Sequence, residues 1–270
     1  MARRTTIMQI TDTHIMPFGQ HWHSAETDTS GRLRKVAEYI SSKNPDAVIM
    51  TGDAIDTRSQ DAYDNLKSIL VNVTVPMYFI PGNHDDRDEM RSAFLDKGYM
   101  PSEGPINYLV DDFDLRLVGL DTNIKNKNGG ELTESSLDWL SDALQSNVTK
   151  PTIVFMHHFP FEVGQPIFDT ILCNTTSRFH DIIKSAPNVV SLMAGHFHEH
   201  LSTMFADKPF FIGKSVAPSH EFSEDGRLIE GLKLDAPAVN VHTYDHETGH
   251  FFSHVHLVHD SVTDNYCFNG

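Results

Sequence analysis

Runs of apolar residues alternate with amphipathic segments along most of this chain. Continuous apolar runs predict strands at 5–10, 47–52, 76–85, 152–158 and 189–196, with shorter ones at 106–110 and 114–120. Apolar residues at helical spacing predict helices at 29–43, 60–71, 134–145 and 176–185. A repeated strand–helix order of this kind indicates an α/β fold with helices outside the sheets.

The pattern changes after residue 215. Prolines and glycines at 216–237 predict loops, and the alternation at 238–259 predicts a hairpin that turns near His246. We therefore expect a main domain at 1–215 and a small C-terminal extension at 216–270, which would serve as a lid or an oligomer contact.

Charge and composition exclude several classes of partner. The chain of 270 residues has 37 acidic and 21 basic residues, a net charge of −16, which argues against binding to a nucleic-acid polymer or an anionic membrane. It has no apolar stretch near ~18 residues, and its start does not resemble a signal peptide. We expect a cytoplasmic protein in which Cys173 and Cys267, the two cysteines, stay reduced; one bridge between them is the alternative.

Metal-ligand residue types follow five of the predicted strands. The clusters are Asp12-Thr13-His14, Gly52-Asp53, Gly82-Asn83-His84-Asp85, His157-His158 and Gly195-His196-Phe197-His198. Each alone is weak, because an Asp-x-His or a Gly-Asp pair usually marks a turn. Loops at the carboxyl ends of strands are where α/β folds place their sites, and Asp, His and Asn suit Mn, Fe, Co or Zn. Five such clusters together predict a metal centre.

The order and content of these clusters resemble the calcineurin-like metallophosphoesterases, whose pattern is D-x-H, G-D, G-N-H-[D/E], H and G-H-x-H. The stretches GNHDD, SLDWL and FMHHFP are most similar to the branch with class III cyclic-nucleotide phosphodiesterases and glycerophosphodiesterases. The resemblance implies an α/β fold built as a two-sheet β-sandwich flanked by helices.

The resemblance also implies a ligand set for two metal ions, of Mn, Fe, Zn or Co. Asp53 would bridge the two ions. His158 would point away from His157, since neighbouring residues of a strand face opposite sides. Two such ions would keep the site positive in an acidic protein and activate a water to attack phosphorus in line. One ion would be held by Asp12, His14 and His198, and the other by Asn83, His157 and His196.

On the substrate side, His84 is the candidate general acid for the leaving group, and Asp85 is the carboxylate expected to orient it. Asn83 and His84 would also contact the substrate. Further candidate contacts are His23, in the segment Gln20-His21-Trp22-His23, and Arg58, Phe159 and Asn174; His220 could reach the pocket from the extension. An ordinary loop or surface role is the alternative for each of them.

The resulting hypothesis is a dinuclear metal-dependent phosphodiesterase for small phosphodiesters, either glycerophosphodiesters or 3′,5′-cyclic nucleotides. One alternative is a phosphomonoesterase or nucleotidase, which needs extra positive charge for a dianion. Another is a non-catalytic metal-binding scaffold. We expect a homodimer or a higher homo-oligomer. The histidines at 242, 246, 250 and 254 are expected at a subunit contact rather than at a third metal.

Overall fold

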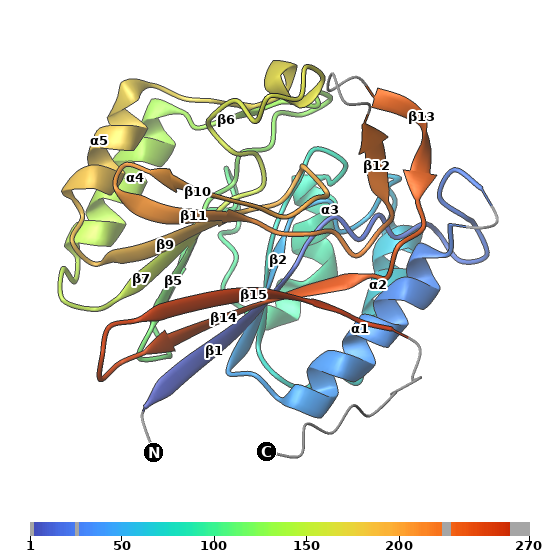
Figure 1. Cartoon of the computed structure of the whole chain (residues 1–270), viewed down its shortest axis with the longest axis horizontal. Coiled ribbons are helices and arrows are strands. Elements are labelled where there is room, and N and C mark those ends of the chain that lie inside the picture. Colours follow the sequence, from blue (N-terminus) through green and yellow to red (C-terminus); the bar gives the residue numbers. More distant parts are fainter. Residues whose placement is uncertain (1–2, 25–26, 223–227, 260–270) are drawn as a thin grey trace, which may run out of the picture.

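Two β-sheets pack face to face in the computed structural model, which describes residues 3–24, 27–222 and 228–259 (Figure 1). The five-stranded sheet has the order β15-β14-β1-β2-β3, and the six-stranded sheet has the order β10-β11-β9-β7-β5-β4. The predicted α/β sandwich is thus confirmed. The first sheet contains β1 (Arg4–Ile10), β2 (Ala47–Thr51), β3 (Met77–Ile80), β14 (Ala238–Asp245) and β15 (Phe251–Leu257). The second contains β4 (Tyr108–Val110), β5 (Arg116–Gly119), β7 (Thr152–Phe155), β9 (Val189–Ala194), β10 (Leu201–Phe205) and β11 (Lys208–Ile212).

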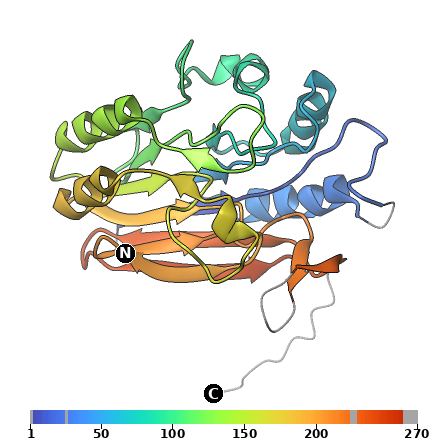
Figure 2. The same cartoon turned by 90° about the horizontal axis from the view of Figure 1, so that it is seen from above.

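Helices cover the outer faces of the sandwich (Figures 1 and 2). The side chain of Thr133 accepts the Ser136 N–H and so caps a helix at the predicted start. The helices are α1 (Thr29–Lys43), α2 (Gln60–Leu70), α3 (Arg87–Ala93), α4 (Glu134–Gln145) and α5 (Ser177–Ser185), with short 3₁₀ turns η1 (Leu95–Lys97) and η2 (Phe168–Thr170). Helix α3 follows the GNHD motif and was absent from the sequence-based expectation.

The central strands are buried on both faces, and the core therefore has two layers. In β7, Ile153 and Phe155 pack into the apolar cluster between the sheets, whereas Val154 and the adjoining Met156 pack into the cluster beneath α4 and α5. This double burial explains why β7 reads as a continuous apolar run rather than an alternating one.

Parallel pairing brings the ends of the motif-bearing strands to one edge. Strands β1, β2 and β3 are parallel to one another, and so are β5, β7 and β9. The clusters at Asp12, Asp53, Asn83, His157 and His196 each follow one of these strands. They therefore meet at the carboxyl edge of the sandwich, where α/β sheets place their sites.

The chain after residue 215 is divided between the sandwich and a separate hairpin. Strand β14 pairs antiparallel with β1, with Asn240 opposite Gln9, and β15 pairs with β14. The predicted hairpin at 238–259 is therefore part of the five-stranded sheet rather than of an appended unit. The segment expected to be loops instead contains two strands, β12 (Ser219–Phe222) and β13 (Leu228–Lys233), which pair antiparallel.

Several shorter elements were also not predicted. The hairpin β10–β11 extends the six-stranded sheet at its edge. The two-residue strands β6 (Gly130–Glu131) and β8 (Cys173–Asn174) pair in parallel. Within the described ranges, every helix is too short or too polar to cross a bilayer.

Candidate functional site

The predicted ligands lie in tight turns just beyond their strands. Five of them have positive φ angles: Asp12 (49°), His14 (45°), Asp53 (47°), His196 (73°) and His198 (63°). A side-chain-bearing residue in this conformation costs on the order of 1–3 kcal/mol, and such strain gathers at functional sites. Each turn directs a ligand-type side chain back over the edge of the sandwich.

Two motif glycines leave room for ligands from other strands. A Cβ at Gly52, whose φ is +90°, would lie 2.4 Å from Nδ1 of His157. A Cβ at Gly82 would lie 2.2 Å from Oδ1 of Asp53 and 2.4 Å from its backbone nitrogen. The glycines of the G-D and G-N-H motifs are thus required because a ligand packs directly on the backbone.

The first cluster contains Asp12, His14 and His198, whose ligand atoms lie within 4.8 Å of one another. Nδ1 of His14 donates to Oδ1 of Asp56 at 3.0 Å, and Nδ1 of His198 donates to the carbonyl of Pro218 at 3.2 Å. Each neutral ring therefore has its lone pair on Nε2. These two Nε2 atoms face each other at 3.2 Å, and that of His198 is 3.5 Å from Oδ1 of Asp12. Such facing acceptors fit a cation between them.

His157 has the same orientation in the second cluster. Its Nδ1 donates to the carbonyl of Thr51 at 2.7 Å, so the lone pair of the neutral ring lies on Nε2. That nitrogen is 3.1 Å from Oδ1 of Asn83 and 3.4 Å from Oδ2 of Asp53, and both oxygens are acceptors. A metal ion satisfies three converging acceptors at once.

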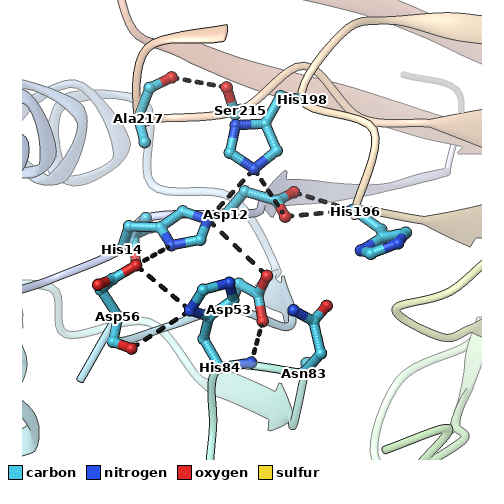
Figure 3. Close-up of polar contacts among 12 residues, drawn as sticks. Asp12, His14, Asp53, Asp56, Asn83, His84, His196, His198, Ser215 and Ala217 are labelled. Carbon is cyan, nitrogen blue, oxygen red and sulfur yellow. Dashed lines mark hydrogen bonds and ion pairs between the residues drawn. The ribbon is translucent and has the colours of Figure 1, made fainter. Parts of the chain in front are cut away.

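Asp53 lies between the two clusters. Its Oδ2 is 3.4 Å from Nε2 of His157 and 3.8 Å from Nε2 of His14, while its Oδ1 accepts the backbone N–H of His84 at 2.8 Å. Figure 3 shows this carboxylate with His14 on one side and His196 on the other. The position is the one that a ligand shared by two ions requires.

The electrostatics of the site favour added positive charge. Burial alone would lower the pKa of His157, but the charge of Asp53 outweighs it and raises the pKa to about 9. Burial would raise the pKa of Asp53, yet the neighbouring histidines, His157 first, hold it well below its usual value. Burial raises the pKa of Asp12 to about 6. A position that draws a proton this strongly onto an imidazole is one where a metal cation is stabilised.

His196 and His158 lie beside His157 but are oriented differently. Nε2 of His196 donates to the carbonyl of Ile171 at 3.2 Å, which leaves Nδ1 as the ligand atom. His158 accepts from Oγ1 of Thr122 at 2.8 Å and donates to the carbonyl of Asn128 at 3.0 Å, so both of its ring nitrogens are engaged.

His158 does not occupy the opposite strand face that the sequence suggested. Strand β7 ends at Phe155, so the alternation rule does not extend to the histidine pair, and the rings of His158 and His196 are 4.5 Å apart. Burial lowers the pKa of His158 to about 3. Its neutral ring holds the loop at 122–128 against the ligand edge.

Asp56, rather than Asp85, is the carboxylate beside His84. Nδ1 of His84 lies 3.3 Å from both Oδ1 and the backbone oxygen of Asp56. Asp85 is buried and accepts from the backbone of Gly82 at 2.9 Å and from the hydroxyl of Tyr63 at 2.9 Å. Burial raises its pKa to about 6. The contacts therefore correct the predicted pair, and Asp85 instead fixes the turn that carries Asn83.

A cavity of about 290 Å³ opens over both clusters. Trp22, His23, Asp56 and His84 form one part of its wall, and Asn128, Ile167, Phe168, Ile171 and His220 form another. The indole of Trp22 stacks on His14 with ring centres 4.7 Å apart, and it donates to Oδ1 of Asp56 at 2.9 Å. Among the residues that the structure describes, the lining includes neither lysine nor arginine.

Of the predicted substrate contacts, Asn83, His84 and His23 line this cavity, and so does His220. Three others lie elsewhere. Arg58 donates to the carbonyl of Asn83 at 2.7 Å and to Asn126, and so braces the GNHD turn. Phe159 is fully buried in the core behind His196. Asn174 is exposed in β8, and its carbonyl accepts from Leu132.

Sequence reasoning missed Asp56, Asn128 and the apolar residues at 167–171. The sequence offered a signal for Asp56, because this second carboxylate follows Asp53 closely in the stretch GDAID. The apolar residues carried none, since they lie in an irregular loop where no periodicity marks a functional face.

The comparisons with known proteins identify the family. The family model described as calcineurin-like phosphoesterase matches residues 5–200, and the chain belongs to this family, as the motifs indicated. An Arcobacter nitrofigilis protein named probable glycerophosphodiester phosphodiesterase GpdQ is 29% identical over 248 residues, which cover 90% of each chain. A Rhodococcus erythropolis protein named probable cyclic nucleotide phosphodiesterase is 29% identical over 250 residues, covering 90% of this chain and 81% of the relative.

A solved structure supports the fold. A dimetal phosphatase from Danio rerio superposes with a TM-score of 0.64 at 15% identity and covers 94% of this chain and 99% of its own. At this identity the likeness concerns the architecture only.

Cys173 is not among the residues that line the cavity. Cys173 is a buried free thiol, and burial raises its pKa to about 12. Cys267, its predicted alternative partner, lies outside the described residues.

Proposed function

We propose that this protein is a dinuclear metal-dependent phosphodiesterase that hydrolyses small phosphodiesters. The observation that carries the proposal is the position of Asp53, whose Oδ2 lies 3.8 Å from Nε2 of His14 and 3.4 Å from Nε2 of His157. Asp12, His14 and His198 would hold one ion, and Asn83, His157 and His196 the other. When bound, the two ions neutralise phosphate oxygens and make a water acidic enough to act as a nucleophile near neutral pH.

The residues around the ions have separate tasks. His84 lines the cavity, and its Nδ1 faces Asp56 at 3.3 Å, so Nε2 is the nitrogen that can meet a substrate. Holding a proton there, His84 would donate it to the oxygen of the departing alcohol. Asp56 would keep the ring in this orientation. Asn83 supplies a neutral carbonyl ligand, and His23 would contact the alcohol from the rim.

Diesters are favoured over monoesters by the charge of the cavity. A phosphomonoester is a dianion and gains from additional cationic side chains, but the described lining residues provide no lysine or arginine. A diester carries one negative charge. Two divalent ions would contribute about +4, and two carboxylate ligands with the nucleophilic hydroxide would remove about 3, which leaves about +1 to match the diester. The names of the relatives, phosphodiesterases for glycerophosphodiesters and for cyclic nucleotides, support the same choice.

The two diester classes differ in the groups that the phosphate carries. The two relatives each align with 90% of this chain, so overall similarity favours neither class. Cyclic AMP presents a base that Trp22 and His23 could stack against, whereas glycerophosphocholine presents hydroxyl groups for Asn128 and His220.

We propose Mn, Fe, Zn or Co as the metals, because the ligand types are Asp, His and Asn. We also propose that the protein is a cytoplasmic homo-oligomer, for the reasons given in the sequence analysis.

The test is a substrate panel on protein reconstituted with Mn²⁺. Bis-p-nitrophenyl phosphate should turn over faster than p-nitrophenyl phosphate, and cyclic AMP and glycerophosphocholine then separate the two classes. Faster turnover of the monoester would replace the proposal with the phosphomonoesterase alternative. Metal binding without any turnover would favour the non-catalytic scaffold.

A further inference from the structure

An exposed isoleucine marks one side of the cavity. Nine large apolar side chains are exposed in the described part of the chain, and Ile167, at 43%, is the one among them that lines the cavity. Ile167 lies beside Phe168 and Ile171, which line the cavity as well. We call these three residues the apolar wall. Core packing does not account for Ile167, because nearly half of its surface faces outward.

The apolar wall is held in a fixed position relative to the second ligand cluster. The carbonyl of Ile171 accepts from Nε2 of His196 at 3.2 Å, and the ring of Phe168 lies 5.6 Å from that of His196. The loop that carries the wall is closed by a hydrogen bond from Val163 N–H to Oδ1 of Asp169 at 2.7 Å. The wall is therefore preorganised rather than formed on binding.

A second element borders the wall. The segment with η2 lies beside the hairpin β12–β13 (Figures 1 and 2), and both contribute residues to the lining of the cavity. Phe168 and His220 approach with ring centres 6.2 Å apart. His220 also lines the cavity, so this hairpin borders the apolar wall.

The apolar wall and His84 lie on different sides of the bridging carboxylate. Figure 3 places His14, Asp56 and His84 on one side of Asp53 and His196 on the other. A phosphodiester has two ester arms. If the departing arm lies beside His84, as the proposed function requires, the arm that stays on phosphorus extends toward His196 and the apolar wall.

We infer that the apolar wall is the subsite for the retained arm and that it selects diesters whose retained arm is apolar or aromatic. The inference rests on the proposed function. Ile167, Phe168 and Ile171 offer dispersion contact and no charge, so a phenyl or similar arm gains from leaving water, while a methyl arm gains little. Ile167 is the specificity-determining residue, because its exposed surface is the part not already buried in the core.

The kinetic test varies only the retained arm. Phenyl p-nitrophenyl phosphate and methyl p-nitrophenyl phosphate both release p-nitrophenolate, so their ratio of kcat/KM reports the other arm. The wild-type enzyme should prefer the phenyl arm, and Ile167→Ala should lower the phenyl-to-methyl ratio by ~3–10-fold, chiefly through KM. Val148→Ala is the matched control, since Val148 is 52% exposed and lines a different surface pocket.

Equilibrium binding gives a readout that does not depend on turnover. Diphenylphosphinate and dimethylphosphinate are monoanions with two arms and no cleavable ester, and calorimetry with metal-loaded protein measures both. Diphenylphosphinate should bind more tightly, and Ile167→Ala should weaken its binding ~3–10-fold while leaving dimethylphosphinate unchanged. If Ile167→Ala weakens the binding of both phosphinates equally, or of neither, the proposed subsite is wrong. The proposed function would still stand in that case if the enzyme hydrolyses diesters. Absence of turnover for every diester would overturn both.

Discussion

Nε2 of His14 lies 3.2 Å from Nε2 of His198, although the Nδ1 atom of each ring already donates to its own acceptor. Two neutral imidazoles in these tautomers direct lone pairs at each other, an arrangement that is unfavourable without positive charge between them. His157 repeats it against Asn83 and Asp53. The orientation of the histidines, more than their presence, makes the edge of the sandwich able to hold metal ions.

Metal removal should destabilise the protein. An ion at one hundred times its Kd adds ~2.7 kcal/mol to the free energy of unfolding, so Mn²⁺ should raise the Tm of chelator-treated protein. His198→Ala should bind one ion fewer by elemental analysis and show a smaller Tm increase. Equal melting temperatures for stripped and reconstituted wild-type protein would contradict the ligand assignment.

Replacing His84 should separate chemistry from metal binding. His84→Ala should retain full metal content but lose ~10²–10⁴ in kcat for alkyl leaving groups, which need a proton. The loss should be much smaller for p-nitrophenolate, which departs without one. Asp56→Asn should show the same dependence on leaving group in weaker form. A fall in metal content that parallels the fall in activity would assign His84 to the ligand set instead.

The comparison of Asp56 with Asp85 tests the corrected pairing. Asp85→Asn alters a buried carboxylate that accepts from Gly82 and Tyr63, so it should lower Tm and leave the leaving-group dependence unchanged. If Asp85→Asn reproduces the kinetic signature of His84→Ala, the contacts described for Asp56 do not govern catalysis.

Gly52→Ala should damage the second cluster. A methyl group there would lie 2.4 Å from Nδ1 of His157, in a backbone with φ of +90°, so both strain and displacement of a ligand are expected. The variant should lose ~1–3 kcal/mol of stability and bind metal more weakly. Gly98→Ala is the control, because Gly98 has a φ of +73° but no atom within 4 Å of the added Cβ. Equal metal affinity in both variants would refute the packing argument.

Acid should destabilise the fold through His242. Burial lowers the pKa of this histidine to about 3, whereas the unfolded chain keeps a value near 6.5. Below pH 6.5 His242 binds a proton in the unfolded state but stays neutral in the folded state. The free energy of unfolding therefore falls as the pH falls, by up to ~1.4 kcal/mol per pH unit for this group. Above pH 6.5 both states are neutral and the effect vanishes.

The pH effect can be measured by denaturant unfolding of metal-stripped protein between pH 5 and 8. His242→Phe should flatten the dependence below pH 6.5, whatever its effect on absolute stability. His180→Phe is the control, since the side chain of His180 is 45% exposed. If the free energy of unfolding of His242→Phe depends on pH as steeply as that of the wild type, His242 is not the cause of the acid destabilisation.

Much of the ligand arrangement could be anticipated from local sequence. Apolar runs such as 5–10 and 47–52 predicted buried strands, and parallel strands end at one edge, so Asp12 and Asp53 were expected together. The chemistry of Asp, His and Asn then indicated a metal centre. Where the prediction relied on strand geometry it failed, because His157 and His158 lie past the end of β7 in a turn.

Contacts between distant segments required the tertiary structure. Asp85 is adjacent to His84 in sequence, yet the turn directs it inward to Tyr63, and Asp56 reaches His84 from another loop. Strand β14 lies beside β1 although more than two hundred residues separate them. Sequence by itself determined which residues are apolar, which can ligate a metal and where strands end, because these depend on neighbours along the chain. The apolar wall and the partner of His84 depended on how loops from different strands meet in space, which only the folded chain decides.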